Sequence, residues 1–258
     1  MKKMRKSAAL LALTLLLSGC AGAKQPSGAV TLAETKADLE ESYYTVAAEL
    51  PLYTGEDADP ALWETLQENW RAWDDQDEMS RLLSSVLPGS CSRSFDTWEA
   101  CEEYLGITLD NPLEADWTKA NESAIPLDTP ALNGNGRHAK VSFYGNRDGE
   151  LESAAVRTGY LDGTVRLALT AYLRCTEEPF TTRCLWAEQV RFETENVTLS
   201  DGTQVLLVSP EDSGNDCSTD AYFIREAGLY TLHAIGEKGE EASIRQTLDR
   251  ALEAFGAK

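Results

Sequence analysis

The residue whose surroundings indicate a definite chemistry is Cys20, which ends the segment Leu17-Ser18-Gly19-Cys20. An aliphatic residue and two small residues directly before a cysteine look like a lipobox, in which the thiol accepts diacylglycerol before the chain is cleaved. Two acyl chains, at about 0.8 kcal/mol per buried methylene, hold a protein on a membrane stably, where one chain is marginal. The sequence therefore predicts lipid attachment at Cys20, with the lipid bilayer as partner.

The segment before Cys20 resembles a secretory signal. Four basic residues lie within Met1 to Lys6, and an uncharged run from Ser7 to Leu17 follows. That run is shorter than the roughly 20 apolar residues that a stable membrane span needs. We therefore expect residues 1–19 to be a signal peptide and residues 20–30 to be the lipidated cysteine with a flexible tether. The folded part would be anchored on the extracytoplasmic face of a bacterial cell membrane.

The net charge excludes one class of partner. The whole chain carries a formal charge of −20, and removal of the four basic residues in the leader leaves 19 basic against 43 acidic residues, about −24. A surface this acidic repels phosphate backbones. We therefore predict that nucleic acid is not a partner.

Five cysteines follow Cys20, and an exported protein can keep disulfides. We favour a bond between Cys175 and Cys184, because the eight residues between them read as a turn that would bring two strand ends together. A bond between Cys91 and Cys101 is the alternative. With no C-x-x-C pair and two histidines, the sequence predicts no metal site and no cofactor.

Groups suited to acid–base catalysis occur without the motifs that usually accompany them. His138 and His233 could titrate near neutral pH, but no G-x-S-x-G or zinc-protease motif lies near either. Neighbouring carboxylates, which can divide acid and base roles, are common in so acidic a chain. They occur at Asp74, Asp75 and Asp77 and at Glu177 and Glu178. We therefore predict that the protein is not an enzyme.

The positions of these side chains are determined by the helices and strands that carry them. Residues 31–90 show sequence patterns that are typical of helices. Thr31 and Glu34 fit a capping box, and a stripe spaced for a helix ends at Pro51. The stripe consists of Leu39, Tyr43, Val46 and Leu50. Asp59-Pro60 would open a second helix carrying Trp70 and Trp73, and a third would end at Pro88-Gly89. We predict a helical N-terminal region over residues 31–90.

Residues 91–258 indicate a sheet flanked by helices. A short helix is predicted from near Asp96 to Gly106, a long connection over residues 109–137, and a terminal helix ending at Gly256. Between the connection and the terminal helix, apolar residues alternate, and turn signals such as Asp162-Gly163 separate the runs. The predicted strands are 139–144, 151–160, 164–174, 184–198, 203–209, 221–225 and 229–235. The predicted fold is α+β: a helical N-terminal region, then an antiparallel meander of about seven strands covered by a C-terminal helix.

Two short segments carry a resemblance. Phe95 to Gly106, and the later Ala221-Tyr222-Phe223-Ile224 with Gly228-Leu229-Tyr230, are similar to an uncharacterised extracytoplasmic domain of Gram-positive bacteria. In that family such segments recur in lipoproteins and in the outer parts of anti-sigma-like membrane regulators. The resemblance covers about residues 90 to 256 and supplies no catalytic residues.

The sequence therefore leaves three function classes. The first is a non-catalytic module that binds or senses an envelope protein or a cell-wall ligand. The second is an envelope hydrolase that uses dispersed carboxylates, which would require several acidic residues to converge in one cleft. The third is the solute-binding lipoprotein of a transporter, which would show two α/β lobes.

Overall fold

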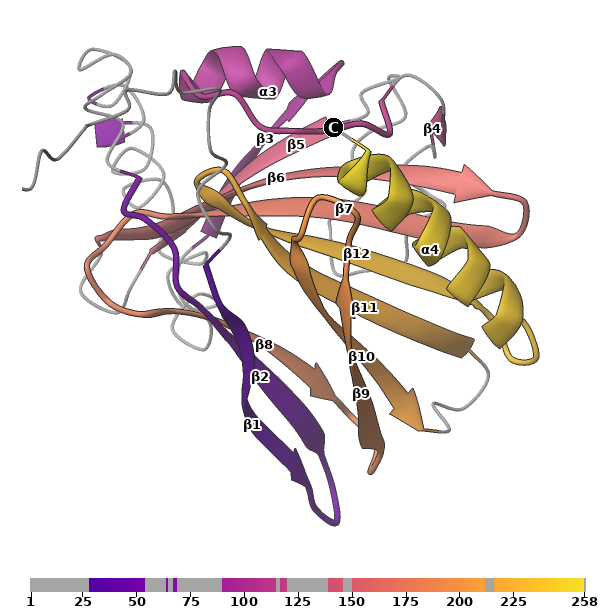
Figure 1. Ribbon diagram of the computed structural model, residues 1–258. Coiled ribbons are helices and arrows are strands. Elements are labelled where there is room, and N and C mark those ends of the chain that lie inside the picture. The colour runs from indigo at the N-terminus through magenta and orange to yellow at the C-terminus, as the bar shows by residue number, and fades with distance from the viewer. Residues whose placement is uncertain are drawn as a thin grey trace, which may run out of the picture.

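The described chain is built mainly from β-strands arranged in two sheets (Figure 1). The computed structural model describes residues 28–53, 90–114, 117–119, 139–145, 150–211 and 216–257, with helical positions at 64, 67 and 68. One sheet has nine strands, in the order β3-β5-β6-β7-β12-β11-β10-β9, with β4 beside β6. The other has three strands, in the order β1-β2-β8. Neighbouring strands in both sheets run antiparallel.

The strands and helices have the following bounds. The first six strands are β1 Val30–Ala37, β2 Ser42–Ala48, β3 Ser90–Phe95, β4 Thr118–Lys119, β5 Ala139–Gly145 and β6 Leu151–Asp162. The others are β7 Val165–Arg174, β8 Phe180–Trp186, β9 Arg191–Thr198, β10 Gln204–Glu211, β11 Asp216–Arg225 and β12 Gly228–Glu237. The helices are α3 Trp98–Leu105 and α4 Glu241–Gly256.

The predicted α+β fold with a helical N-terminal region is wrong. Residues 30–48 form the hairpin of β1 and β2, and β2 also pairs with β8. Ser42, Tyr44, Val46 and Ala48 are buried in alternation, so the true period is two, and Leu39 of the expected helical stripe is 92% exposed. The second and third predicted helices lie outside the described residues, apart from positions 64, 67 and 68.

The expected capping box of Thr31 and Glu34 lies instead in strand β1, where the pairing with β2 is irregular. The register of β1 against β2 shifts between Leu32 and Glu34, as at a β-bulge. Thr31 pairs with Ala47 across this hairpin. A Ser/Thr-x-x-Glu/Gln spacing is therefore compatible with a strand when a partner strand supplies the backbone hydrogen bonds.

Most of the individual strands predicted in the C-terminal region are confirmed, but the predicted continuous meander is wrong, because β7 pairs with β12 and β8 belongs to the other sheet. Six of the expected strands correspond to β5, β6, β7, β10, β11 and β12. The two-residue connection between β6 and β7 contains Gly163 at φ 63°, a left-handed conformation that suits glycine. The predicted strand 184–198 is wrong, because it comprises parts of β8 and β9, which belong to different sheets.

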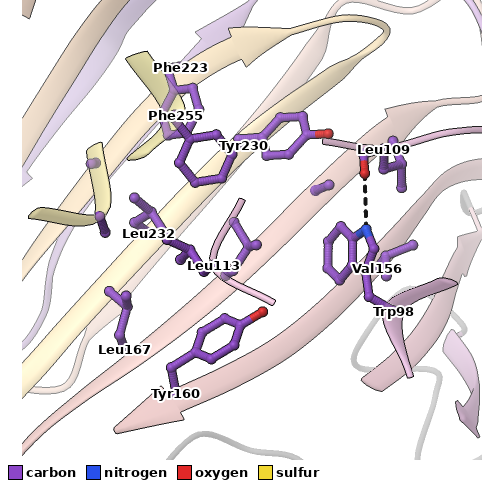
Figure 2. Packing of buried hydrophobic residues seen from close by; sticks show 14 of the residues in the cluster. Trp98, Leu109, Leu113, Val156, Tyr160, Leu167, Phe223, Tyr230, Leu232 and Phe255 are labelled. Atoms are coloured by element: carbon purple, nitrogen blue, oxygen red, sulfur yellow. Dashed lines mark hydrogen bonds between the residues drawn. The ribbon is translucent and has the colours of Figure 1, made fainter. Parts of the chain in front are cut away.

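The first core lies between the nine-stranded sheet and its two helices (Figure 2). Thr97 caps α3 by accepting a hydrogen bond from the Ala100 amide at 3.2 Å, and Gly106 ends it with φ 66°. The Trp98 indole donates to the Leu109 carbonyl at 3.1 Å. This bond secures part of the predicted connection, which therefore contributes to the core.

The terminal helix α4 covers the middle strands of the same face (Figure 1). Its buried side includes all four predicted residues, Ile244, Leu248, Leu252 and Phe255. The Phe255 ring lies 5.0 Å from the Phe223 ring and 5.8 Å from the Tyr230 ring, centroid to centroid, in edge-to-face arrangements. The aromatic contacts secure the end of α4 against β11 and β12.

The second core lies on the opposite face, between the three-stranded sheet and β10 to β12. Tyr44 and Val46 of β2 pack there with Leu206, Val208 and Tyr222 of the larger sheet. Each of these side chains is at most 6% exposed. The N-terminal hairpin is therefore an integral layer of the fold and not a separate region.

The favoured bond between Cys175 and Cys184 is absent, and both thiols are free in the structure. After β7 the chain leaves the larger sheet and enters β8, which pairs with β2 of the smaller one. Cys175 consequently packs against the first core and Cys184 against the second. The turn between them connects two sheets, so it does not close a hairpin.

Candidate functional site

Polar side chains meet inside the second core. The Tyr44 hydroxyl of β2 donates to Asp220 of β11 and lies 2.7 Å from the Tyr222 hydroxyl. The Nδ1 atom of His233, on β12, lies 2.5 Å from the other Asp220 oxygen. We call these four residues the Tyr44 network.

The pairing register of β11 and β12 brings three residues of the Tyr44 network together. Asp220 is paired with His233 across β11 and β12, and Tyr222 lies two residues further along β11, on the same face. Tyr44 is brought from the other sheet by β2. An ionised carboxylate only accepts hydrogen bonds, so with Asp220 ionised the Nδ1–H of His233 donates to it.

A thiol lies next to this network without being activated. Cys184 is the cross-strand partner of Tyr44, and burial raises the pKa of its thiol to about 11. Burial also raises the pKa of Tyr44 and Tyr222 well above 10. Because the thiolate is the nucleophilic form, a protonated Cys184 is a poor nucleophile at neutral pH. The arrangement is suited to joining two sheets through satisfied polar groups.

A groove of about 670 Å³ opens on the other face of the same strands, between the start of α4 and β9 to β11. Leu207 and Ile244, which are buried, contribute apolar surface to it. Its polar lining includes Ser209 and Thr219, whose hydroxyls lie 2.9 Å apart. The other lining residues are Glu193, Thr194, Glu195, Pro210, Cys217, Ser218, Glu241 and Arg245.

Charge in the groove is predominantly negative. Glu193, Glu195 and Glu241 line it with one cationic residue, Arg245. Arg245 reaches from α4 to Glu195, with Nη1 2.6 Å from Oε2, and it also contacts Asp249 at 2.8 Å. The hydrogen bond from Arg245 holds the pKa of Glu195 below its usual range.

The outer wall of the groove is the edge of the larger sheet. Among the described strands, β9 is the last in that sheet, and it pairs with β10 over all eight of its residues, without a register shift. Glu193 is opposite Ser209 and Glu195 is opposite Leu207, so both glutamates lie on the groove face.

The structure places the predicted candidate residues apart. His233 belongs to the Tyr44 network, whereas Glu177 and Glu178 are exposed in the turn after β7. Cys20, His138, the Asp74, Asp75 and Asp77 set, and Trp70 and Trp73 lie outside the described residues. Among the described side chains, no group of three His, Cys, Asp or Glu residues converges in a way that could hold a metal ion.

Sequence reasoning missed both the network and the groove. Asp220 and His233 are connected by the register of the β11–β12 hairpin, but Tyr44 lies 176 residues before Asp220, and no spacing rule connects it with them. The alternation Glu193-x-Glu195 was the available signal for an acidic strand face. It was hidden because the strand was predicted to continue from position 184.

No protein-family model, curated protein or solved structure matches this chain. The resemblance to an extracytoplasmic domain of Gram-positive bacteria therefore stays a prediction. Within the described part of the chain, neither helix is long and apolar enough to span a bilayer.

Proposed function

We propose that the protein is a lipid-anchored extracytoplasmic module that binds an envelope component without catalysis. The observation that carries the binding function is the groove beside α4, which combines buried apolar surface with polar and charged groups on its rim. The lipobox-like segment ending at Cys20 supports the location. A tether of about ten residues would leave the groove free to meet a partner at the membrane.

The binding function is tested by obstructing the groove. The detergent-solubilised protein, immobilised on a column, should retain an envelope component. We expect Thr219→Trp to abolish this retention, because the indole would fill the space above Leu207. Thr108→Trp, at an exposed position after α3, is the matched control and should retain the component. Melting curves of both variants report folding. Identical retention by a folded Thr219→Trp variant would exclude the groove as the binding site.

The lipid anchor is tested separately. Cys20→Ala should release or mislocalise the protein and abolish incorporation of labelled palmitate, because the acyl chains supply the membrane affinity. Membrane fractionation of cells expressing each form measures the effect. A variant that stays in the membrane fraction as the unsubstituted chain does, without lipid label, would contradict anchoring at Cys20.

An envelope hydrolase is the second candidate, and one observation favours it: three glutamates line one groove. General acid catalysis needs one carboxyl with a raised pKa, whereas Arg245 lowers the pKa of Glu195. Incubation with purified wall fragments distinguishes the candidates. Turnover that Glu193→Gln abolishes would support the hydrolase and contradict the non-catalytic proposal.

A solute-binding lipoprotein of a transporter would show two α/β lobes. The described residues instead form two packed antiparallel sheets, with α4 across one face. We therefore do not propose it.

A further inference from the structure

We infer that β9 accepts a lysine- or arginine-rich extended segment of a partner protein as an additional strand along the groove. The inference rests on the proposed function, because it names a partner that pairs with the outer wall of the same groove and directs alternate side chains toward its glutamates. A strand added to a sheet edge gains main-chain hydrogen bonds, and its alternate side chains supply specificity.

The backbone of β9 is suited to this pairing. Its eight residues contain no proline, and its ladder with β10 has no register shift. Proline and bulges are two devices by which proteins protect exposed edges, and β1 at the edge of the smaller sheet has an irregular register. β9 therefore offers a regular edge whose protection comes from its charged side chains.

Those charges specify the chemistry of the partner. Glu193 and Glu195 project two residues apart on the groove face and are exposed. Side chains directly opposite in paired strands approach closely, and opposite charges there are favourable. Two basic residues at alternate positions of the added strand would face the two glutamates.

The contact of Arg245 with Glu195 gives an internal example of the same recognition. Its guanidinium already meets that carboxylate at 2.6 Å from the α4 side. Glu241, at the start of α4, adds a further negative charge to the groove. With three carboxylates and one guanidinium, the groove keeps a net negative charge that attracts a cationic segment.

A second copy of this chain does not fit the edge. Antiparallel pairing of β9 with another β9 would bring the Glu193-x-Glu195 faces together, and like charges directly opposite each other are destabilising. The chain as a whole also carries a charge of −20, which disfavours self-association. The edge therefore selects a basic segment over another copy of itself.

The experiment measures fluorescence anisotropy of a labelled probe peptide, Thr-Lys-Val-Lys-Val-Lys-Thr, with the detergent-solubilised full-length processed protein. We expect saturable binding that weakens at high salt, and none to the peptide with glutamate in place of lysine. Combined Glu193→Gln and Glu195→Gln should weaken binding about fivefold to tenfold, because two cross-strand charge pairs are lost. Combined Glu99→Gln and Glu103→Gln, exposed on α3, removes the same charge and should change affinity less than about twofold.

Backbone methylation separates strand addition from simple charge attraction. Alternate amides of an added strand face the sheet, so the probe is N-methylated on either the odd or the even residues. One methylated probe should lose binding at least about tenfold while the other retains it.

Equal binding by both methylated probes, or unchanged affinity in the Glu193→Gln and Glu195→Gln variant, would overturn the inference. Such a result, combined with loss of the envelope component from Thr219→Trp, would leave the groove as a binding site for another ligand. Retention of that component by Thr219→Trp would instead overturn the proposed function itself.

Discussion

The Tyr44 network and the groove lie on opposite faces of the same strand, β11. Asp220 and Tyr222 point into the second core, where another sheet covers them, whereas Cys217 and Thr219 line the groove beside α4. In the Tyr44 network the polar groups hydrogen-bond to one another, and the side chains of His233 and Asp220 are only 20% and 10% exposed. On the other face α4 covers the middle strands only, so polar groups near β9 remain available to a ligand.

This comparison predicts different responses to substitution. Changes in the packed layers should alter the free energy of unfolding, and changes in the groove should alter binding. A residue shared by both functions should alter both.

Phe255→Ala should have the largest effect, because it removes a fully buried ring at the contact of α4 with β11 and β12. We expect a loss of about 3–5 kcal/mol in the free energy of unfolding, measured by urea denaturation. Probe binding should weaken as well, since α4 forms one wall of the groove. Glu253→Ala, on the exposed side of α4, is the control; a loss below about 1 kcal/mol for Phe255→Ala would contradict this packing.

Tyr44→Phe should separate stability from binding. It leaves Asp220 without one donor in a buried site, which costs about 1–3 kcal/mol. Tyr43→Phe, the neighbouring residue on the exposed side of β2, should cost less than about 0.5 kcal/mol. Affinity for the basic probe should be unchanged in both variants, and a parallel loss in a folded Tyr44→Phe protein would mean that the two faces are coupled.

Thiol labelling compares the burial of Cys101, in the first core, with that of Cys184, beside the second core. Burial raises the pKa of Cys101 to about 12 and that of Cys184 to about 11. The neutral thiols therefore contribute stability that is fully present below about pH 9 and is lost as pH rises through 11 to 12. At pH 8 the fully buried Cys101 should resist N-ethylmaleimide in the folded protein, and the partly buried Cys184 should react more slowly than in the unfolded chain, as mass spectrometry of each site would report. Rapid labelling of Cys101 in the folded protein would contradict its burial.

Arg245→Gln should give the smallest change in stability and an increase in probe affinity. The side chains of its ion pairs with Glu195 and Asp249 are about half exposed, and ion pairs in contact with solvent contribute about 0–1 kcal/mol. Removal of the guanidinium frees Glu195 and makes the groove more negative, so the basic probe should bind about twofold to fivefold more tightly. Weaker binding would mean that Arg245 itself contacts the ligand.

Local patterns predicted the elements whose partners are near in sequence. The alternating run of β7, the Asp162-Gly163 turn, and the apolar stripe of α4 each contain their own signal. Each hairpin connection also determines its own antiparallel pairing. For these parts the sequence was sufficient because hydrogen bonding and burial follow from one continuous segment.

Tertiary structure decided the remainder. Val46 fits both a helical stripe and a strand, and pairing of β2 with β8 selects the strand. The passage of the chain between sheets after Cys175 separates it from Cys184, which no local spacing reveals. Asp220 and His233 are already opposite each other in the hairpin of β11 and β12, but Tyr44 meets Asp220 and Tyr222 only after the two sheets pack, because the burial that makes these hydrogen bonds necessary exists only in the assembled fold.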